Sequence, residues 1–446
     1  MADVAVADVG APSPVDIPKL PASHVAAVVV GNALQFYDFL TYAFFATQIG
    51  RTFFPSHDAS ASLLASLATF GAGFLTRPIG AVVIGGLGDR VGRKPAMILS
   101  FALMGIAIVG LAATPSFAAI GIAAPICAIA FRLIQGFALG GEVGPSTAYL
   151  IEAAPPHRRG FYVSLQYTTQ DAAVLAAGLI GMVLANVLTP RALDEWGWRI
   201  AFLVGAVIVP FGLVMRRRLT ETLHEGAVLQ IDHHAKGFGA YARVAFLGLA
   251  MLGSGTIVSY VMSYMTTYAT VTLHMASNLA FAATVVLGLA GVVFDTPGGW
   301  LSDRLGRKRV MIAPWALLLI ATLPSFWLIG HYRTSWALLG ATGALAILTS
   351  IGASSVLITI TESLPRRVRS GALATIYALA ISTFGGSTQF VITWLMRITG
   401  DPLAPAWYMA GAIAIGLAAM LLMPETAPGH LRPSPSDRKA AAAVKS

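Results

Sequence analysis

Charged residues and cysteine are both scarce in this sequence, and each scarcity excludes a class of protein. Asp, Glu, Lys and Arg make up 11% of the 446 residues, whereas about a quarter of the residues in a soluble globular domain are charged. The single cysteine, Cys127, leaves no partner for an intrachain disulfide and no cysteine-based metal site. The sequence also lacks a GxxxxGK[ST] phosphate-binding loop. These absences argue against a soluble globular protein, redox chemistry and ATP-driven transport.

Apolar residues are abundant instead. They make up 56% of the chain, and the mean hydropathy is +0.74. Because a run of about 20 apolar residues crosses a bilayer as a helix, we predict an all-α polytopic membrane protein with twelve transmembrane helices. The expected spans are residues 24–47, 61–86, 96–114, 117–150, 160–189, 198–215, 241–271, 277–301, 310–331, 336–362, 371–396 and 405–423.

The formal net charge of +9 has a topological explanation. Lys and Arg gather in alternate loops, which is the bias that marks cytoplasmic loops. Both termini are therefore expected to be cytoplasmic, and nucleic acid is not expected as a partner. Residues 1–23 carry three aspartates before the lone Lys19, so we interpret them as a polar tail and not as a signal peptide.

An internal repeat divides the chain into two halves. "DRVGRK" at 89–94 returns as "DRLGRK" at 303–308, and "IEAAPPHRRG" at 151–160 is echoed by "TESLPRRVRSG" at 361–371. Such repeats indicate two pseudo-symmetric six-helix bundles with a substrate site between them. The expected units are a tail at 1–23, a bundle at 24–215, a linker at 216–240, a bundle at 241–423 and a tail at 424–446.

The repeated loop motifs resemble the signatures of the major facilitator superfamily. "GGLGDRVGRK" follows the second expected span, "GGWLSDRLGRKR" follows the eighth, and "RLIQG" stands in the fourth. The resemblance implies the major facilitator fold. More narrowly, "GNALQFYDF" at 31–39, "GFLTRPIGA" at 73–81, "RLIQGFALGGEVGPSTAYLIEAAP" at 132–155 and "EWGWRIAFLVG" at 195–205 resemble the metabolite:proton symporter family.

Two further segments are similar to the citrate and tricarballylate symporters of that family, namely "ATQIGRTFFP" at 46–55 and "SLQYTTQ" at 164–170. The resemblance implies proton-driven uptake of an organic acid across a bacterial inner membrane. One position departs from the pattern. Relatives usually carry Glu where Gln35 stands, so a carboxylate one turn before Asp38 is missing here.

Ionisable residues inside expected spans are candidates for proton coupling, because each costs roughly 2.5–3.5 kcal/mol to bury in a bilayer. Asp38 and Arg132 match an acid and an arginine that sugar porters of the superfamily pair. We expect deprotonated Asp38 to pair with Arg132 and protonated Asp38 to release it for substrate; a permanent structural ion pair is the alternative. Glu142 is either a second titratable site or a buried, hydrogen-bonded acid.

A substrate with several carboxylates needs fixed cations, and guanidinium binds carboxylate bidentately. Arg77 and Arg132 are the arginines inside expected spans, although Arg77 could instead satisfy a carbonyl freed by Pro78. Asp171 and Asp295 also lie in spans and receive no role.

Amides and phenols complete the expected substrate site. Gln166 and Gln170 lie one turn apart, and Tyr260 and Tyr264 form a stripe at helical spacing; helix packing is the alternative for all four. Gln389 is a weaker candidate. The predicted substrate-binding residues are Arg77, Arg132, Gln35, Gln166, Gln170, Tyr260 and Tyr264.

The charged loop motifs predict a gate. Acids and arginines in matched positions at helix ends can form salt bridges whose breaking tilts the equilibrium between outward- and inward-facing states. Positive-inside topology alone would explain the arginines but not the acids. The predicted gating residues are Asp89, Arg90, Arg93, Glu152, Arg158, Arg159, Asp303, Arg304, Arg307, Glu362 and Arg366.

These patterns predict a secondary transporter that imports citrate or a related di- or tricarboxylate by proton symport and alternating access. The alternatives are uptake of shikimate, a dicarboxylate or a betaine- or proline-type osmolyte, a nutrient sensor on the same fold, and drug efflux. We expect no enzymatic activity, no cofactor and no metal site, since the proton gradient supplies the energy. The expected partners are the organic acid, protons and the lipid bilayer, with a monomer as the working unit.

Overall fold

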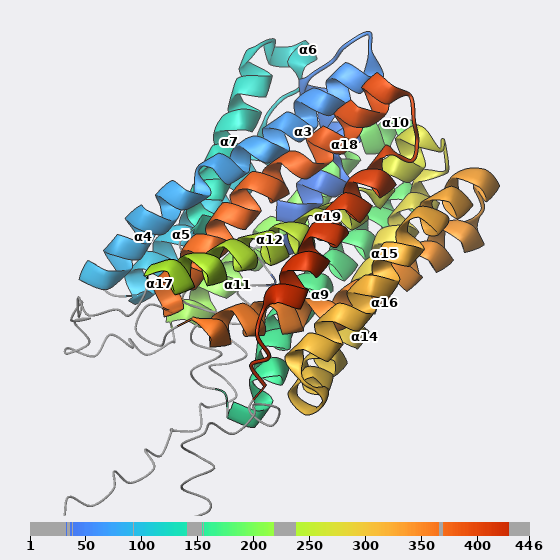
Figure 1. Cartoon of the computed structure of the whole chain (residues 1–446). Coiled ribbons are helices and arrows are strands. Elements are labelled where there is room, and N and C mark those ends of the chain that lie inside the picture. The colour runs from blue at the N-terminus through green and yellow to red at the C-terminus, as the bar shows by residue number, and fades with distance from the viewer. Residues whose placement is uncertain are drawn as a thin grey trace, which may run out of the picture.

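The computed structural model describes residues 33, 36–37, 39–91, 93–140, 154, 156–217, 238–364 and 369–427. Within these ranges every regular element is a helix, and the long helices pack side by side with their axes roughly aligned (Figure 1). In the described part of the chain, eight helical stretches are long and apolar enough to cross a bilayer, out of the twelve that the hydropathy predicts for the whole chain. Several aliphatic side chains are highly exposed, among them Val82, Ile122 and Val187. Such a surface suits contact with lipid.

Bounds of the helices are as follows. The first half contains α2 (Ala46–Phe53), α3 (Ala59–Leu75), α4 (Arg77–Val91), α5 (Arg93–Ala113), α6 (Phe117–Ile120), α7 (Ala123–Gly140), η1 (Pro156–Arg158), α9 (Arg159–Val187), α10 (Pro190–Ala192), η2 (Leu193–Gly197) and α11 (Trp198–Arg217). The second half contains α12 (Phe238–Ser263), α13 (Met265–Thr267), η3 (Tyr268–Thr272), α14 (Ser277–Leu305), α15 (Arg307–Tyr332), α16 (Ser335–Ser363), α17 (Arg369–Ala380), η4 (Ile381–Gly385), α18 (Gly386–Thr399) and α19 (Ala404–Leu422).

Several expected spans are interrupted, and in two of them the sequence shows a backbone cause. The span expected at 117–150 starts as the short helix α6, which ends at Ile120 and is capped by Gly121, and α7 begins anew at Ala123. Gly121 has a φ of 58°, a conformation that glycine adopts without the steric cost of a Cβ atom. The span expected at 61–86 is divided at Thr76, and Pro78 stands in the first turn of α4, where its missing N–H breaks no helical hydrogen bond.

Buried side chains form two hydrophobic clusters, one in each half. One consists mainly of residues between 37 and 202, and the other mainly of residues between 247 and 423. In the first half α3 and α7 cross very closely. A Cβ atom on Gly136 of α7 would lie only 1.6 Å from the carbonyl oxygen of Gly73 on α3, so only glycine fits at this position. Small residues allow this approach in membrane helices, and it carries Arg132 of α7 to the aromatic face of α3.

The two halves touch most extensively through α9 with α14 and α3 with α18, and further contacts join α9 to α16 and α4 to α17. At one end, which we call the motif end, backbone N–H groups at the start of α9 bond to Asp303 at the end of α14. At the opposite end, the far end, Asn278 Nδ2 donates to Asn186 Oδ1 over 3.1 Å and Arg397 pairs with Asp58 over 2.7 Å. The described helices are therefore joined across the halves at both ends.

Candidate functional site

Arg132 lies completely buried in the middle of the first bundle, with an exposed fraction of 0%. Its Nη1 donates to Gln135 Oε1 over 2.6 Å, and its Nη2 donates to the carbonyl oxygen of Phe70 over 3.3 Å. The guanidinium carbon also lies 4.4 Å from the ring centre of Phe39 and 4.6 Å from that of Tyr42. The charge is thus held by an amide, a carbonyl and the faces of aromatic rings.

Arg77 reaches the same aromatic cluster from the start of α4. Its guanidinium carbon lies 4.4 Å from the ring centre of Phe39 and 4.2 Å from that of Phe74, so the two arginines predicted for substrate lie against one shared phenylalanine. Within the described part of the chain, Arg77 Nε has no hydrogen-bond partner. The Arg77 side chain is half-buried, and its buried Nε remains available to a group that accepts hydrogen bonds.

The second half contributes Tyr260 to this cluster. The Tyr260 ring centre lies 5.7 Å from that of Phe74 and 6.0 Å from that of Phe70. Gln389 of α18 donates from Nε2 to the Tyr260 carbonyl over 3.4 Å, while its Oε1 has no partner among the described residues. The candidate site therefore lies between the bundles and carries both cationic and amide groups.

The other predicted polar residues divide into two kinds. Gln170 is a hydrogen-bonding neighbour of the Tyr377 hydroxyl, and Tyr377, like Tyr260, is an electrostatic neighbour of Arg77, so Gln170 borders the site. The hydroxyl of Tyr264 instead accepts a hydrogen bond from Thr393 over 2.8 Å, which fits the packing alternative. Gln166 is buried on α9. Gln35, Asp38 and Glu142 lie outside the described residues, so the expected pairing of Asp38 with Arg132 stays a prediction.

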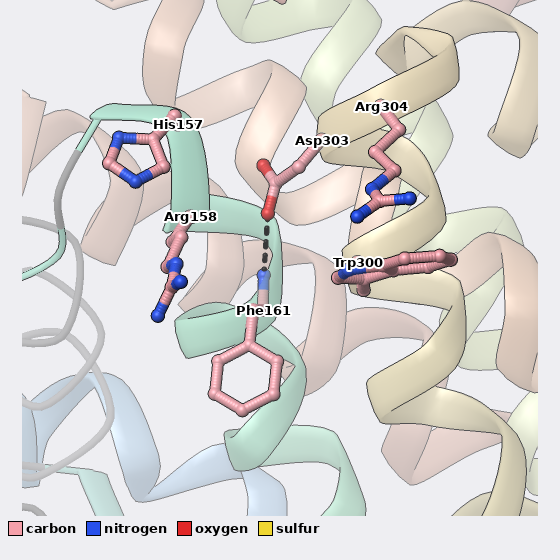
Figure 2. Close-up of a pocket in the computed structure, with 6 residues that line it drawn as sticks. All are labelled: His157, Arg158, Phe161, Trp300, Asp303 and Arg304. Carbon is pink, nitrogen blue, oxygen red and sulfur yellow. Dashed lines mark hydrogen bonds between the residues drawn. The ribbon is translucent and has the colours of Figure 1, made fainter.

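The motif end contains the second group of predicted residues. The Asp303 carboxylate accepts the backbone N–H groups of Gly160 over 2.9 Å and of Phe161 over 3.1 Å, and Figure 2 shows the second of these bonds. Those are the first free N–H groups of α9, where the helix dipole favours a negative charge. Sequence spacing did not reveal this contact, because it depends on which helices are neighbours.

Salt bridges extend from Asp303 across the motif end. Arg307 Nη1 lies 2.6 Å from Asp303 Oδ1, and Arg307 Nη2 lies 3.3 Å from Glu362 Oε1. Arg159 of α9 lies 4.0 Å from the same Glu362 oxygen. The network thus joins α9 of the first half to α14, α15 and α16 of the second. Predicted gating side chains outside the described part of the chain are those of Asp89, Arg90, Arg93, Glu152 and Arg366.

Arg158 and Arg304 lie at the surface of the motif end. Together with His157, Phe161, Trp300 and Asp303 they line a cavity of about 330 Å³ (Figure 2). The guanidinium carbon of Arg304 stacks 4.0 Å from the Trp300 ring centre. This position beside the network fits a peripheral role for both arginines.

Sequence reasoning missed one arrangement. Asp171 of α9 and Asp295 of α14, to which it gave no role, are hydrogen-bonding neighbours in the contact between the halves. Both were visible as rare acids in apolar spans. The missing signal was their proximity, since apolar periodicity does not say which helices pack together.

The fold and site define a multi-pass membrane protein with buried charge between two helical bundles, the arrangement of a secondary transporter. Family models agree in both halves: the model described as sugar (and other) transporter matches residues 24–224, and that of the major facilitator superfamily matches residues 244–445. The chain belongs to the major facilitator superfamily and has its fold of twelve helices in two bundles.

Individual proteins with similar sequences include transporters of organic acids and of proline and betaine. A citrate-proton symporter of Klebsiella pneumoniae is 35% identical over 402 residues, which cover 89% of this chain and 90% of the relative. The alpha-ketoglutarate permease of Escherichia coli is 33% identical, with 88% and 91% covered. A proline/betaine transporter of Salmonella typhimurium is 31% identical, with 93% and 86% covered. The crystal structure of a D-xylose-proton symporter shares the fold, with a TM-score of 0.72 at 20% identity over 91% of this chain and 98% of that one.

Proposed function

We propose that this protein imports citrate or a related di- or tricarboxylate by proton symport, through alternating access, across a bacterial inner membrane. The observation that carries the proposal is the pair of arginines, Arg77 and Arg132, at one buried cluster between the bundles. Two fixed guanidinium groups suit a substrate with two or three carboxylates. The citrate-proton symporter and the alpha-ketoglutarate permease among the relatives point to the same class of substrate.

A betaine- or proline-type osmolyte is the second candidate. The aromatic rings of Phe39, Phe70, Phe74 and Tyr260 resemble the surroundings that quaternary ammonium ligands prefer, and a proline/betaine transporter is also a relative. Arg77 and Arg132 already lie against these rings, however, and would repel an added cation. The proposal therefore favours an organic acid.

Membrane orientation follows from the same proposal. With both termini in the cytoplasm, the motif end faces the cytoplasm and the far end faces outward. The salt bridges of Arg159, Asp303, Arg307 and Glu362 then hold the cytoplasmic side closed, and we assign these residues to gating. The substrate is assigned to Arg77, Arg132, Gln170 and Tyr260.

The test is uptake of radiolabelled citrate into proteoliposomes with an inward proton gradient. We expect accumulation above equilibrium that a protonophore abolishes and that unlabelled tricarballylate or another carboxylate competes. Empty liposomes provide the background. Accumulation that only betaine competes would replace the organic acid by the osmolyte, and citrate entry that ignores the protonophore would remove proton coupling from the proposal.

A further inference from the structure

Asp171 and Asp295 lie opposite each other on two antiparallel helices, one from each half. The register of α9 against α14 is set by close contacts along their whole length: Asp303 meets the start of α9, a Cβ on Gly288 would lie 2.3 Å from the backbone nitrogen of Leu175, and Asn278 meets Asn186. In this register Asp171 and Asp295 come within hydrogen-bonding contact.

The pair lies deep in the bilayer. Asp171 follows the start of α9 at Arg159 by twelve residues, and Asp295 precedes the end of α14 at Leu305 by ten. At a rise of about 1.5 Å per residue these positions are about 15–18 Å from the motif end, near the middle of a hydrocarbon layer about 30 Å thick. Ionised carboxylates are most costly at that depth.

Packing around the two carboxyls is tight. A Cβ atom on Gly291 would lie 1.8 Å from Asp171 Oδ2, so glycine leaves the space that this carboxyl occupies. Asp295 has an exposed fraction of 1%, and its Oδ2 has no hydrogen-bond partner in the described part of the chain. Two bare carboxylates cannot donate to each other, whereas one added proton creates an O–H···O⁻ bond and removes one of two like charges.

The groups that face the pair do not neutralise it. Ser350 of α16 is a hydrogen-bonding neighbour of the Asp295 carboxyl, and Ser354 donates to the Asp295 backbone oxygen over 3.5 Å. Tyr167 of α9 is an electrostatic neighbour of both carboxyls and of Tyr377 on α17, and phenols are neutral at pH 7. Among the described residues neither carboxyl forms a salt bridge with Lys, Arg or His.

We infer that Asp171 and Asp295 form a proton-binding site that latches the two halves together when it holds one proton. Loss of this proton to water leaves two carboxylates facing each other and drives α9 and α14 apart. Re-association of the halves requires that one proton from solution returns to the pair. One proton is therefore taken up each time the latch closes and released each time it opens.

The latch also borders the candidate substrate site. Gln170 precedes Asp171 in the chain and contacts Tyr377, which is a neighbour both of Tyr167 beside the acids and of Arg77. This inference rests on the proposed function to the extent that the proton serves symport. The latch itself requires no particular substrate, so it can be tested without one.

The first experiment measures the distance between the halves as a function of pH. In a chain with Cys127 replaced by serine, spin labels are placed on exposed positions at the far end (Val187→Cys with Ala276→Cys) or at the motif end (His157→Cys with Arg309→Cys). In lipid nanodiscs without substrate, we expect the closed-to-open ratio to fall by up to about tenfold per pH unit where the pair titrates. The double variant D171N/D295N should show a ratio that stays constant with pH at the two ends.

A matched control removes a contact between the same helices without removing a titratable group. The hydroxyls of Thr168 and Thr296 lie 2.9 Å apart across α9 and α14, and Thr296→Val breaks this contact with almost no change in volume. Thr296→Val should keep the pH dependence of the unmodified chain. The inference is overturned if D171N/D295N still responds to pH, or if Thr296→Val also loses the response.

The second experiment connects the latch to transport. Single variants Asp171→Asn and Asp295→Asn imitate the protonated acid, so each should lose proton-driven accumulation of citrate and retain exchange of labelled for unlabelled citrate. If the double variant fails to fold, these single variants replace it in the distance measurement. Equal loss of accumulation and exchange would overturn the coupling role. Absence of citrate transport in the unmodified protein would contradict the proposed substrate only, because the distance measurement decides the latch independently.

Discussion

At the scale of single residues, Arg132 and Arg77 make their charges available in different ways. Arg132 already donates from both terminal nitrogens, to Gln135 and to Phe70, whereas Arg77 lies on ring faces with an unused Nε. A ligand therefore meets a guanidinium oriented in advance at Arg132 and an unused donor at Arg77. Planar, two-pronged donation is what lysine cannot provide at either position.

We expect Arg132→Lys and Arg77→Lys each to raise the KM for citrate by about 10- to 100-fold, which corresponds to the loss of about 1.5–3 kcal/mol in a charged hydrogen bond. The measurement is initial uptake in proteoliposomes at saturating proton gradient. Arg199→Lys is the matched control, because Arg199 donates to the carbonyl oxygens of Ala112 and Thr114. An equal rise in KM for that variant would attribute the effect to folding.

Residue types alone predicted much of this site. Buried arginines are rare in membranes, and Tyr260, which was a candidate beside the alternative of helix packing, lies in the aromatic cluster next to them. The pairing of Asp171 with Asp295 could not be predicted, because the two residues are more than a hundred positions apart in sequence and their contact depends on the register of α9 against α14. Tyr264 shows the converse: the same spacing placed it on the stripe, yet its hydroxyl bonds to Thr393.

At the scale of elements, Asp303 joins the end of α14 to the start of α9. We expect Asp303→Asn to weaken this junction by about 1.5–3 kcal/mol, the range for hydrogen bonds to charged groups, and to favour states with an open motif end. The measurement is labelling of Phe161→Cys by a membrane-impermeant thiol reagent in a chain with Cys127 replaced by serine. Labelling should accelerate at least about fivefold, the lower bound of a typical coupling between sites.

The control for this variant removes an acid whose ion pair lies within one half of the molecule. Glu195 pairs with Arg191 over 2.7 Å at the exposed far end, so Glu195→Gln should leave the labelling rate unchanged. An unchanged rate in Asp303→Asn would contradict the gating role, and an equal acceleration in both variants would show that any lost acid has this effect.

Helix bounds were predictable where apolar length decides them. The span expected at 160–189 is α9 at Arg159–Val187, and that expected at 336–362 is α16 at Ser335–Ser363. Hydropathy failed to predict the break between α6 and α7, because it takes no account of the positive φ that Gly121 adopts there. The expected end of the span at residue 301 was also too early, since α14 continues through Asp303 to Leu305. The charged side chains there interrupt the apolar pattern but not the helix.

At the scale of the whole molecule, junctions hold both ends of the two halves together. Asp303 bonds to α9 at the motif end, and Arg397 pairs with Asp58 at the far end. Within the second half, Glu425 fastens the chain after α19 to the start of α15 by accepting the N–H groups of Arg307 and Lys308. Burial opposes ionisation of Glu425, but these backbone donors together with those of Thr426 and Ala427 hold the pKa of its carboxyl below the usual value. Alternating access requires that one end opens while the other stays closed.

The ion pair of Asp58 with Arg397 gives the far end a junction whose contribution can be measured. Its side chains are 46% and 48% exposed, so it should contribute only about 0.2–1 kcal/mol. We expect Asp58→Asn to raise the open population at the far end by less than about fivefold at low salt, as measured with the labels at Val187 and Ala276. The difference should vanish near 1 M salt, where the Debye length is about 3 Å.

A charge exchange tests whether this pair acts by attraction between the halves. The double variant D58R/R397D restores opposite charges in the opposite order, and it should return the far end to the closed population of the unmodified chain. Asp194 offers the control, because its pair with Arg51 lies within the first half, so Asp194→Asn should change nothing. A charge exchange that leaves the far end open would mean that α3 and α18 are held by packing, and that the salt bridge follows closure without stabilising it.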